Sequence, residues 1–311
     1  MGGWCRPQTD GPGLRSAALI LFANILLDAG QTDYVNNKLI PSIKFDLEWV
    51  HNNWQSDGCD LWEEVRSNDF FWNRNSFYYS LGIAEKLFNR VGDSSYASKC
   101  SSTASSIRST LDSHWTGTFM KESDNRQKDS AVIHAFSSFG AYPITDDKVA
   151  KTISTYAMTF CIEYPINQED NKKGIAGVLV GRYPGDSYAG GNPWQLLTAV
   201  LAKTFYQGAT TLQENNGFEE EEDQEAWSQL LNIPKDSSTD DFVKASISAG
   251  DSVMNRLYEH VKNDGSHIAE QISKTGGNQV SAKDLTWSYA NILSALQERK
   301  KATEMKKEVV E

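Results

Sequence analysis

Apolar residues along this chain of 311 residues are distributed in two ways that alternate from segment to segment. In one kind of segment they surround the helix axis almost completely, which predicts a helix buried on most sides. In the other kind they recur at steps of three and four residues and lie on one helix face. The first kind covers residues 14–27, 77–88, 193–206 and 285–296. Asn192 and Pro193 predict that the third of these begins at residue 193, with Asn192 as its N-cap.

The second kind of segment has a single apolar stripe. The clearest stripe consists of Ala97, Cys100, Ala104, Ile107 and Leu111. Further stripes run over residues 40–50, 149–160 and 242–257, and a shorter helix is expected over residues 130–139.

This alternation predicts an all-α protein with five inner and four outer helices, which is the arrangement of an (α/α)6 toroid. Because a complete six-fold toroid has twelve helices, about nine of the twelve are expected here. We therefore predict a single, incomplete domain over residues 1–311, with an acidic surface excursion over residues 214–224. Loops that lead into inner helices open on one face of a toroid, so their polar residues should converge there.

Composition narrows the classes of partner. The chain has 30 basic and 41 acidic residues, and the formal net charge of −11 argues against binding a nucleic-acid backbone. The apolar segment over residues 14–27 is too short to span a membrane, and we interpret it as a buried helix. No signal peptide is visible. We expect neither a nucleic-acid nor a membrane partner.

No metal or cofactor is expected. The four cysteines, Cys5, Cys59, Cys100 and Cys161, show no CxxC spacing, and the five histidines show no metal-ligand spacing. The sequence is compatible with one or two disulfides, and their pairing stays open. The sequence contains neither a glycine-rich phosphate loop nor a GxSxG motif.

The strongest local signal for chemistry is an acidic loop at residues 60–65, with the sequence DLWEEV. It places Asp60, Glu63 and Glu64 beside Trp62. Crowded carboxylates favour a proton on one of them, which suits a general acid. Glycoside cleavage also needs a second carboxylate from elsewhere in the chain. A capping or solvated segment is the alternative interpretation.

Two further segments carry candidate residues. Glu270 lies among polar and glycine-rich neighbours. The glycine- and proline-rich loop at residues 181–194 contains Arg182, Asp186 and two tyrosines, a set that suits recognition of sugar hydroxyls. A purely structural Arg182–Asp186 pair is the alternative.

Together these segments resemble the glucoamylases of glycoside hydrolase family 15, in the order and spacing typical of that family. Residues 4–12 (WCRPQTDGP) resemble its WGRPQxDGP motif, and residues 60–65 resemble its DLWEEV. Residues 181–194 (GRYPGDSYAGGNPW) resemble GRYPEDxYxxGNPW. Glu270-Gln271 and residues 281–289 (SAKDLTWSY) resemble its SEQ and SARDLTWSY segments.

The resemblance implies a glucan 1,4-alpha-glucosidase that acts on starch, glycogen or maltooligosaccharides from the chain end. Glu63 would be the general acid, Glu270 the general base that activates water, and Asp60 would tune the acid. The mechanism would be a single-step inversion that releases β-D-glucose. In inverting enzymes the two carboxyl groups lie about 6.5–9.5 Å apart, which leaves room for the water.

The resemblance also implies a set of substrate-binding residues. Trp4 would pack beside the acid, Arg182 would bind hydroxyls of the terminal glucose, and Tyr183 and Trp194 would support that loop. The full set is Trp4, Arg6, Leu61, Trp62, Glu64, Arg182, Tyr183 and Trp194.

The chain departs from the family pattern at three positions within or next to the motifs. Cys5 stands where the family has glycine, so a thiol would enter tight space beside the acid. Cys59 replaces an aromatic residue, and Gly185 replaces an acidic one. These departures bear on substrate affinity more than on the type of reaction.

The family has about three further helices upstream that grip the terminal glucose, so the resemblance implies that the domain of residues 1–311 is N-terminally truncated. We therefore expect the chain alone to be weakly active or inactive, and an open toroid to expose apolar sides of inner helices. The alternative is a non-catalytic domain like the related toroid in the regulatory subunits of phosphorylase kinase. Loss of one carboxylate would favour it, whereas Glu63 and Glu270 are both present. The resemblance implies a secreted, vacuolar or lysosomal location. The sequence leaves the oligomeric state open.

Overall fold

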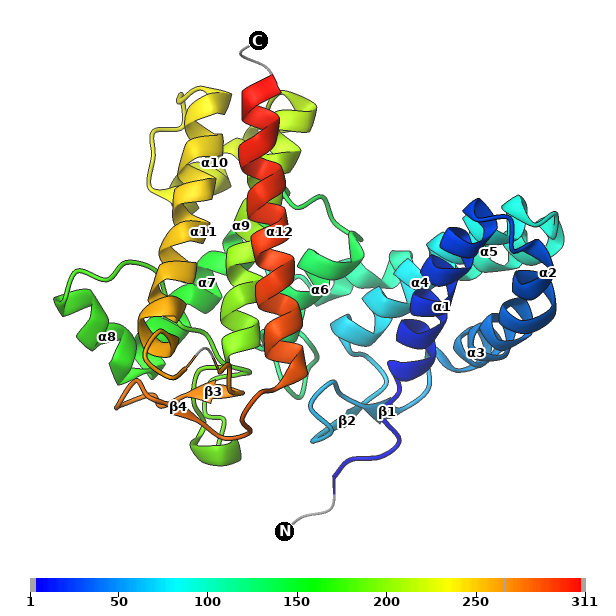
Figure 1. The fold of residues 1–311 in the computed structure, drawn as a ribbon, viewed down its shortest axis with the longest axis horizontal. Coiled ribbons are helices and arrows are strands. Elements are labelled where there is room, and N and C mark those ends of the chain that lie inside the picture. Colours follow the sequence, from blue (N-terminus) through cyan, green and yellow to red (C-terminus); the bar gives the residue numbers. More distant parts are fainter. Residues whose placement is uncertain (1–3, 266, 309–311) are drawn as a thin grey trace. The chain divides into compact units, whose positions relative to one another are not determined.

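The computed structural model describes residues 4–265 and 267–308, and Figure 1 shows its elements as a ribbon. Helices dominate the described residues, and the strands there are four segments of two residues each. The chain forms two compact units. Unit 1 contains the described residues of Met1–Thr116, Lys121–Gln127 and Phe139–Ala141. Unit 2 contains those of Gly117–Met120, Lys128–Ser138 and Tyr142–Glu311.

Unit 1 is built from helices that pack around one apolar core. Its elements are α1 (Gly11–Asp28), α2 (Thr32–Tyr34), a π-helical turn (Val35–Leu39), α3 (Ile40–Asn53), β1 (Gly58–Cys59), β2 (Arg66–Ser67), α4 (Phe71–Arg90) and α5 (Ser94–Leu111). α4 packs against α1 and α5, and α1 also packs against α3. The core residues include Ile20, Ile43, Leu47, Leu81 and Ile107, each with no exposed surface.

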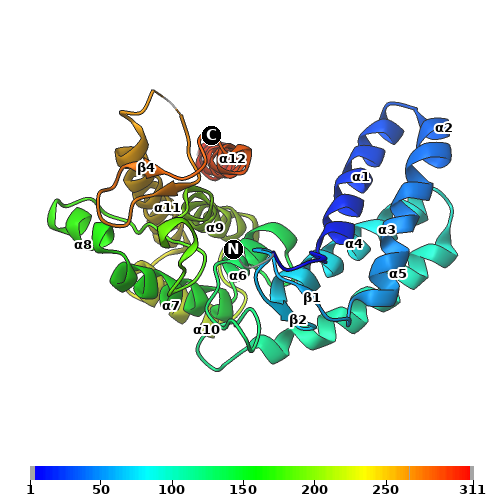
Figure 2. The ribbon, with the colours of Figure 1, turned by 90° about the horizontal axis from the view of Figure 1, so that it is seen from below.

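Unit 2 contains the remaining long helices. Its elements are α6 (Ala131–Phe139, whose last residue belongs to unit 1), α7 (Asp147–Glu163), α8 (Pro165–Lys172), α9 (Gln195–Asn215), α10 (Glu221–Leu231), α11 (Thr239–Val261), β3 (Gln271–Ile272), β4 (Gln279–Val280) and α12 (Thr286–Glu308). α9 packs against both α11 and α12, and these helices lie side by side in Figures 1 and 2. α10 packs against α7.

The nine helices predicted from the apolar pattern are all present, as α1, α3, α4, α5, α6, α7, α9, α11 and α12. Their stripes face the core as predicted, since Ala97, Cys100, Ala104, Ile107 and Leu111 are all buried. Asp93 caps this helix because its side chain accepts the Tyr96 N–H. The short helices α2, α8 and α10 were not predicted.

The predicted start of α9 at residue 193 is wrong. α9 begins at Gln195, and Trp194 before it is extended, with φ −104° and ψ 130°. The Trp194 N–H donates to Val180 O at 2.8 Å. Asn192 does not cap the helix, because its Oδ1 accepts the Lys274 N–H at 3.0 Å instead of an N–H of the first turn. Contacts with distant segments therefore override the local capping signal.

The interpretation of residues 14–27 as a helix buried on most sides is wrong for one face. Leu21, Phe22 and Ile25 of α1 are exposed, as are Leu293 and Leu296 of α12. An apolar composition on every face does not say which faces have neighbours. α1 uses its other side to contact α3 and α4, and α12 packs mainly against α9. No helix in the described ranges is long and apolar enough to cross a lipid bilayer.

The predicted acidic excursion covers the end of α9, a short connection and the first turn of α10. Glu221, Glu222 and Asp223 lie in that first turn, where negative charge complements the helix dipole. Asp223 also contacts the beginning of α7, because its Oδ1 accepts the Asp147 N–H at 2.7 Å.

Candidate active site

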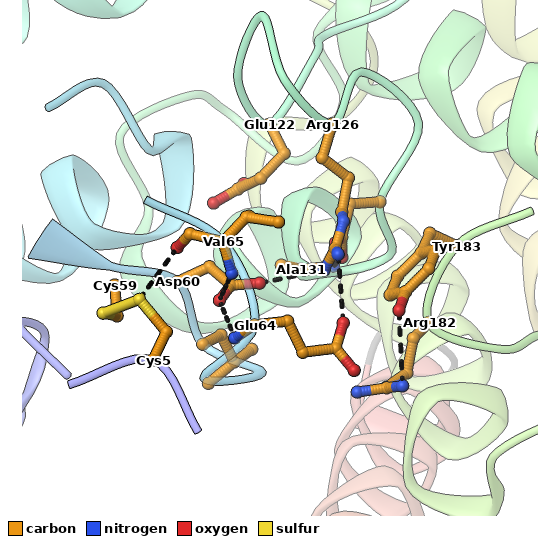
Figure 3. Close-up of polar contacts among 12 residues, drawn as sticks. Cys5, Cys59, Asp60, Glu64, Val65, Glu122, Arg126, Ala131, Arg182 and Tyr183 are labelled. Atoms are coloured by element: carbon orange, nitrogen blue, oxygen red, sulfur yellow. Dashed lines mark hydrogen bonds and ion pairs between the residues drawn. A yellow bond between two sulfur atoms is a disulfide. The ribbon is translucent and has the colours of Figure 1, made fainter. Parts of the chain in front are cut away.

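The acidic loop of unit 1 connects the two strands of a β-hairpin. β1 pairs antiparallel with β2, with Gly58 opposite Ser67 and Cys59 opposite Arg66. Asp60 organises the loop: its Oδ1 accepts the N–H groups of Glu64 at 2.7 Å and Val65 at 3.1 Å (Figure 3). An aspartate side chain that accepts backbone N–H groups ahead of it fixes the turn that follows.

Glu63 lies at the tip of this hairpin in a left-handed backbone conformation, with φ 61°. Its N–H donates to Asp60 O at 3.0 Å, and its carbonyl accepts the Cys5 N–H at 2.7 Å. Its carboxylate forms an ion pair with Arg6, and 17% of the side chain is exposed. The predicted general acid is therefore held by its own backbone and by the preceding segment, and it stays accessible.

Arg126 is a contact of the acidic loop that the sequence motifs did not identify. Its Nη1 lies 2.9 Å from Asp60 Oδ2 and its Nη2 lies 3.0 Å from Glu64 Oε2, so one guanidinium joins both carboxylates (Figure 3). Only 13% of its side chain is exposed. Three neighbouring carboxylates predict a cation close to them. The sequence alone does not show whether Arg6, Arg66 or Arg126 supplies it.

Asp10 is a second residue that the sequence analysis did not single out for chemistry. Its carboxylate is buried and accepts the indole N–H of Trp72 at 2.8 Å. Burial raises the pKa of the Asp10 carboxyl, while the Trp72 hydrogen bond acts in the opposite direction. The negative charges of Asp60 and Glu63 also raise it, which places Asp10 in the same electrostatic neighbourhood.

The segment that precedes Asp10 lies along the hairpin. Gln8 forms a bridge with Cys59, and Gln8 Nε2 donates to Leu61 O at 3.2 Å. A disulfide joins Cys5 to Cys59, with their Cα atoms 5.6 Å apart. The expectation of a Cys5 thiol in tight space beside the acid is therefore wrong, and the pairing that the sequence left open is Cys5–Cys59. Cys100 and Cys161 are free.

The other predicted residues of unit 1 differ in exposure. Trp4 is 63% exposed, so its ring is available to a ligand. Leu61 and Trp62 are buried. The buried side chains of Leu61 and Trp62 shape the loop, so these two residues could contact a ligand only through their backbone groups.

In unit 2, Arg182 is held on several sides. Its guanidinium forms a two-point ion pair with Asp186, at 2.8 and 2.7 Å, and both side chains are almost fully buried. The rings of Tyr183, Tyr188 and Trp194 surround it, with centroids 5.0–5.4 Å from Arg182 Cζ. Figure 3 shows the further contact from Arg182 to the Tyr183 hydroxyl, at 3.5 Å. The structural Arg–Asp pair that the sequence analysis considered is therefore present.

Glu270 lies directly before β3 and is buried. Its carboxylate accepts a hydrogen bond from the Ser281 hydroxyl, and Gln271 Nε2 lies 3.4 Å from the same oxygen. Its carbonyl accepts the Gln195 N–H at 3.1 Å, and Gln271 bridges to Trp194. The structure thus brings Glu270 to the end of the loop that carries Arg182.

One group of acidic side chains could approach a cation together. Asp146, Asp147 and Asp223 are the group that meets this condition among the described residues. Asp223 already accepts a backbone hydrogen bond from Asp147, and Asp147 pairs with Lys151 at 2.5 Å. These contacts account for the group as a helix-capping arrangement.

Comparisons with known proteins give a consistent result. The sequence profile described as Glycosyl hydrolases family 15 matches residues 1–297. A glucoamylase of Blastobotrys adeninivorans is 30% identical over 336 residues, covering 94% of this chain and 53% of that protein. Glucoamylase 1 of Rhizopus oryzae is 31% identical over 323 residues, with 94% and 53% covered. The chain spans about half the length of the curated relatives it matches.

Comparison with solved structures also finds glucoamylases. The glucoamylase of Hormoconis resinae superposes with a TM-score of 0.84 at 27% identity, covering 96% of this chain and 54% of that one. The glucoamylase of Saccharomycopsis fibuligera gives 0.83 at 25% identity, covering 98% and 72%. Glucoamylases have the (α/α)6 barrel fold, which confirms the predicted fold class. From its matched residues and its fold, the chain belongs to glycosyl hydrolase family 15.

Proposed function

We propose that this protein hydrolyses terminal α-1,4-glucosidic bonds of starch, glycogen or maltooligosaccharides and releases β-D-glucose with inversion. The observation that carries the proposal is Glu63, which lies at a hairpin tip, ion-paired to Arg6 and partly accessible, in a family 15 chain. The proposal treats residues 1–311 as part of one catalytic domain.

In this mechanism Glu63 donates a proton to the glycosidic oxygen as the bond to the anomeric carbon breaks. Glu270 accepts a proton from the water that attacks the opposite face of the sugar, so the product has the β configuration. Ser281 and Gln271 orient the Glu270 carboxylate through their hydrogen bonds. A fixed orientation matters because a general base must meet the water at a defined angle.

Other residues close to Glu63, and the loop that carries Arg182, would bind the glucan. The exposed Trp4 ring offers an apolar face to the C–H face of a pyranose. Glu64, fixed by Arg126, would accept hydrogen bonds from sugar hydroxyls near the scissile bond. Because Asp186 occupies the Arg182 guanidinium, we assign Arg182 to shaping its loop, with hydroxyl binding by that loop's polar groups.

The test is release of glucose from maltotriose, with the anomer followed by proton NMR. We expect β-glucose from the wild type at the low rate that the sequence predicts, and a loss of at least about 10³-fold in kcat for Glu63→Gln and Glu270→Gln, because general acid–base catalysis contributes on that scale. The control is Glu219→Gln, the same change at an exposed residue of the acidic run.

Each outcome is informative. Release of α-glucose would contradict inversion. Full activity in Glu63→Gln would contradict the assignment of the acid, and no glucose from the folded wild-type protein would contradict the proposed activity of this chain.

A further inference from the structure

The disulfide between Cys5 and Cys59 lies next to both partners of the Arg6–Glu63 ion pair. Cys5 directly precedes Arg6, and Cys59 directly precedes the loop that carries Glu63. The two cysteines are 54 positions apart in sequence, yet their Cα atoms lie 5.6 Å apart (Figure 3). The covalent link therefore closes a long segment at the point where Arg6 meets the candidate acid.

Residues 4–6 are held to the hairpin by an exposed ion pair and by backbone hydrogen bonds, and the next residues are held by Cys59 N–H to Pro7 O at 3.3 Å and by the contacts of Gln8. The Arg6 side chain is 62% exposed. An exposed ion pair contributes roughly 0–1 kcal/mol, because water screens it and two long side chains lose freedom. The backbone adds Cys5 N–H to Glu63 O at 2.7 Å and Arg66 Nη1 to Arg6 O at 2.9 Å. An ion pair of this kind persists when its partners are already held close together.

A disulfide supplies that proximity. It removes the entropy cost of bringing the two segments together, a cost that grows with the length of the closed segment. With the link in place, Arg6 needs only a rotamer choice to reach Glu63. Without it, the whole segment that carries Trp4, Cys5 and Arg6 must be ordered by its remaining hydrogen bonds.

We propose that the Cys5–Cys59 disulfide positions Arg6 against the Glu63 carboxylate, and that reduction of this disulfide releases Arg6 and lowers turnover. Cys5 and Cys59 are thus positioning residues that act through Arg6. The consequence for turnover rests on the proposed function, whereas the tethering of the segment does not. In the reduction a dithiol delivers two electrons and two protons, the S–S bond breaks to two thiols, and the dithiol becomes a cyclic disulfide.

A disulfide that only stabilises the fold would behave differently. It would lower the midpoint of thermal unfolding on reduction, but kcat of the folded protein would stay unchanged well below that temperature. The distinguishing measurement is therefore a double-mutant comparison. If the disulfide acts through Arg6, Arg6→Ala in the oxidised protein reproduces the effect of reduction, and reduction has no further effect on it.

The experiment treats the oxidised protein with dithiothreitol and counts thiols after denaturation. Two thiols are expected before reduction and four after it. Amide hydrogen exchange of Cys5 reports the tether directly, because this N–H bonds to Glu63 O. We expect its exchange to accelerate about tenfold or more on reduction. We also expect kcat on maltotriose to fall about three- to tenfold, with a smaller change in KM.

The control is the double variant Cys5→Ser/Cys59→Ser, which keeps the free Cys100 and Cys161. It should show the reduced behaviour from the start and no response to dithiothreitol. Unchanged Cys5 exchange after confirmed reduction would overturn the tether. Faster exchange with unchanged kcat would overturn the role in turnover. A protein that never releases glucose would contradict the proposed function, while the exchange measurement would still decide the tether.

Discussion

Arg126 shows how one side chain can determine the arrangement of the candidate site. Its guanidinium spans Asp60 and Glu64, and Asp60 in turn fixes the backbone that carries Glu63. A planar guanidinium can serve two carboxylates at once, which an ammonium group cannot do equally well. Removing it leaves two carboxylates close together without their shared cation, a costly arrangement when one of them is buried.

We therefore expect Arg126→Gln to lower kcat/KM on maltotriose by about 10- to 100-fold, and Arg126→Lys to lie between this variant and the wild type. The control is Arg108→Gln, which removes the pair between Arg108 of α5 and Asp112 just after that helix, and which should leave kcat/KM unchanged. Wild-type kcat/KM in a folded Arg126→Gln protein would contradict the role of Arg126.

His134 in α6 gives a second prediction at this scale. Burial and the charge of Lys203 lower the pKa of His134 to about 4. The folded protein thus holds this ring neutral, and the stability that follows is present above about pH 6.5 and lost as pH falls towards 4.

Between pH 7 and pH 4.5 the free energy of unfolding should fall by about 2–3 kcal/mol more in the wild type than in His134→Gln, whose side chain does not titrate. Urea titrations at the two pH values measure this difference. His51, with a pKa lowered to about 4 mainly by burial, adds an acid dependence that both proteins share. Equal losses in the two proteins would contradict the prediction.

At the scale of elements, the sequence predicted where helices lie better than how their ends are arranged. The stripe of α5 works because a period of three and four residues depends only on the helix itself. The start of α9 depends on a residue outside the helix, because the Trp194 N–H donates to Val180 O. The Cys5–Cys59 pairing and the Arg126 contacts likewise join residues 54 or more positions apart. Local patterns carry no information about such contacts.

The packing of α9 against α11 gives a prediction about Gly250. A Cβ at Gly250 of α11 would lie 2.5 Å from Tyr206 Cε1 on α9, too close for real atoms. Gly250→Ala should therefore destabilise the protein by about 1–3 kcal/mol, because two packed helices must shift.

Gly82 of α4 is the matched control, since a Cβ there meets no atom within 4 Å. Gly82→Ala should stabilise the protein by about 0.5–1 kcal/mol through helix propensity alone. Urea unfolding of both variants measures the contrast, and a Gly250→Ala protein that is as stable as the wild type or more stable would show that the close approach of Gly250 to Tyr206 is unimportant.

At the scale of the whole molecule, α1 presents an apolar stripe to solvent. Leu21, Phe22 and Ile25 follow Ala18 at helical spacing, and all four are exposed. Contiguous exposed apolar surface promotes association, whereas single exposed apolar residues are ordinary. An open toroid is expected to expose apolar sides of its inner helices, although the pattern of residues 14–27 by itself predicts a helix buried on most sides.

We expect the double variant Leu21→Gln/Ile25→Gln to aggregate less than the wild type at the same concentration, as measured by light scattering. The control is Phe45→Gln on α3, which removes one exposed aromatic residue outside the stripe. Scattering equal to wild type in the double variant, or an equal reduction in Phe45→Gln, would show that the stripe does not drive association.

The backbone of Glu63 has a consequence for how this protein would respond to selection. A non-glycine residue at φ 61° is held in a conformation that costs about 1 kcal/mol or more, and glycine adopts it freely. Glu63→Gly should therefore be about 1 kcal/mol more stable than Glu63→Ala, although both lack the carboxylate.

A library screened for thermal tolerance alone would enrich glycine over alanine at this position, whereas a screen for glucose release should retain only glutamate. Sequencing the survivors of both screens would show whether stability and activity demand different residues at the same site.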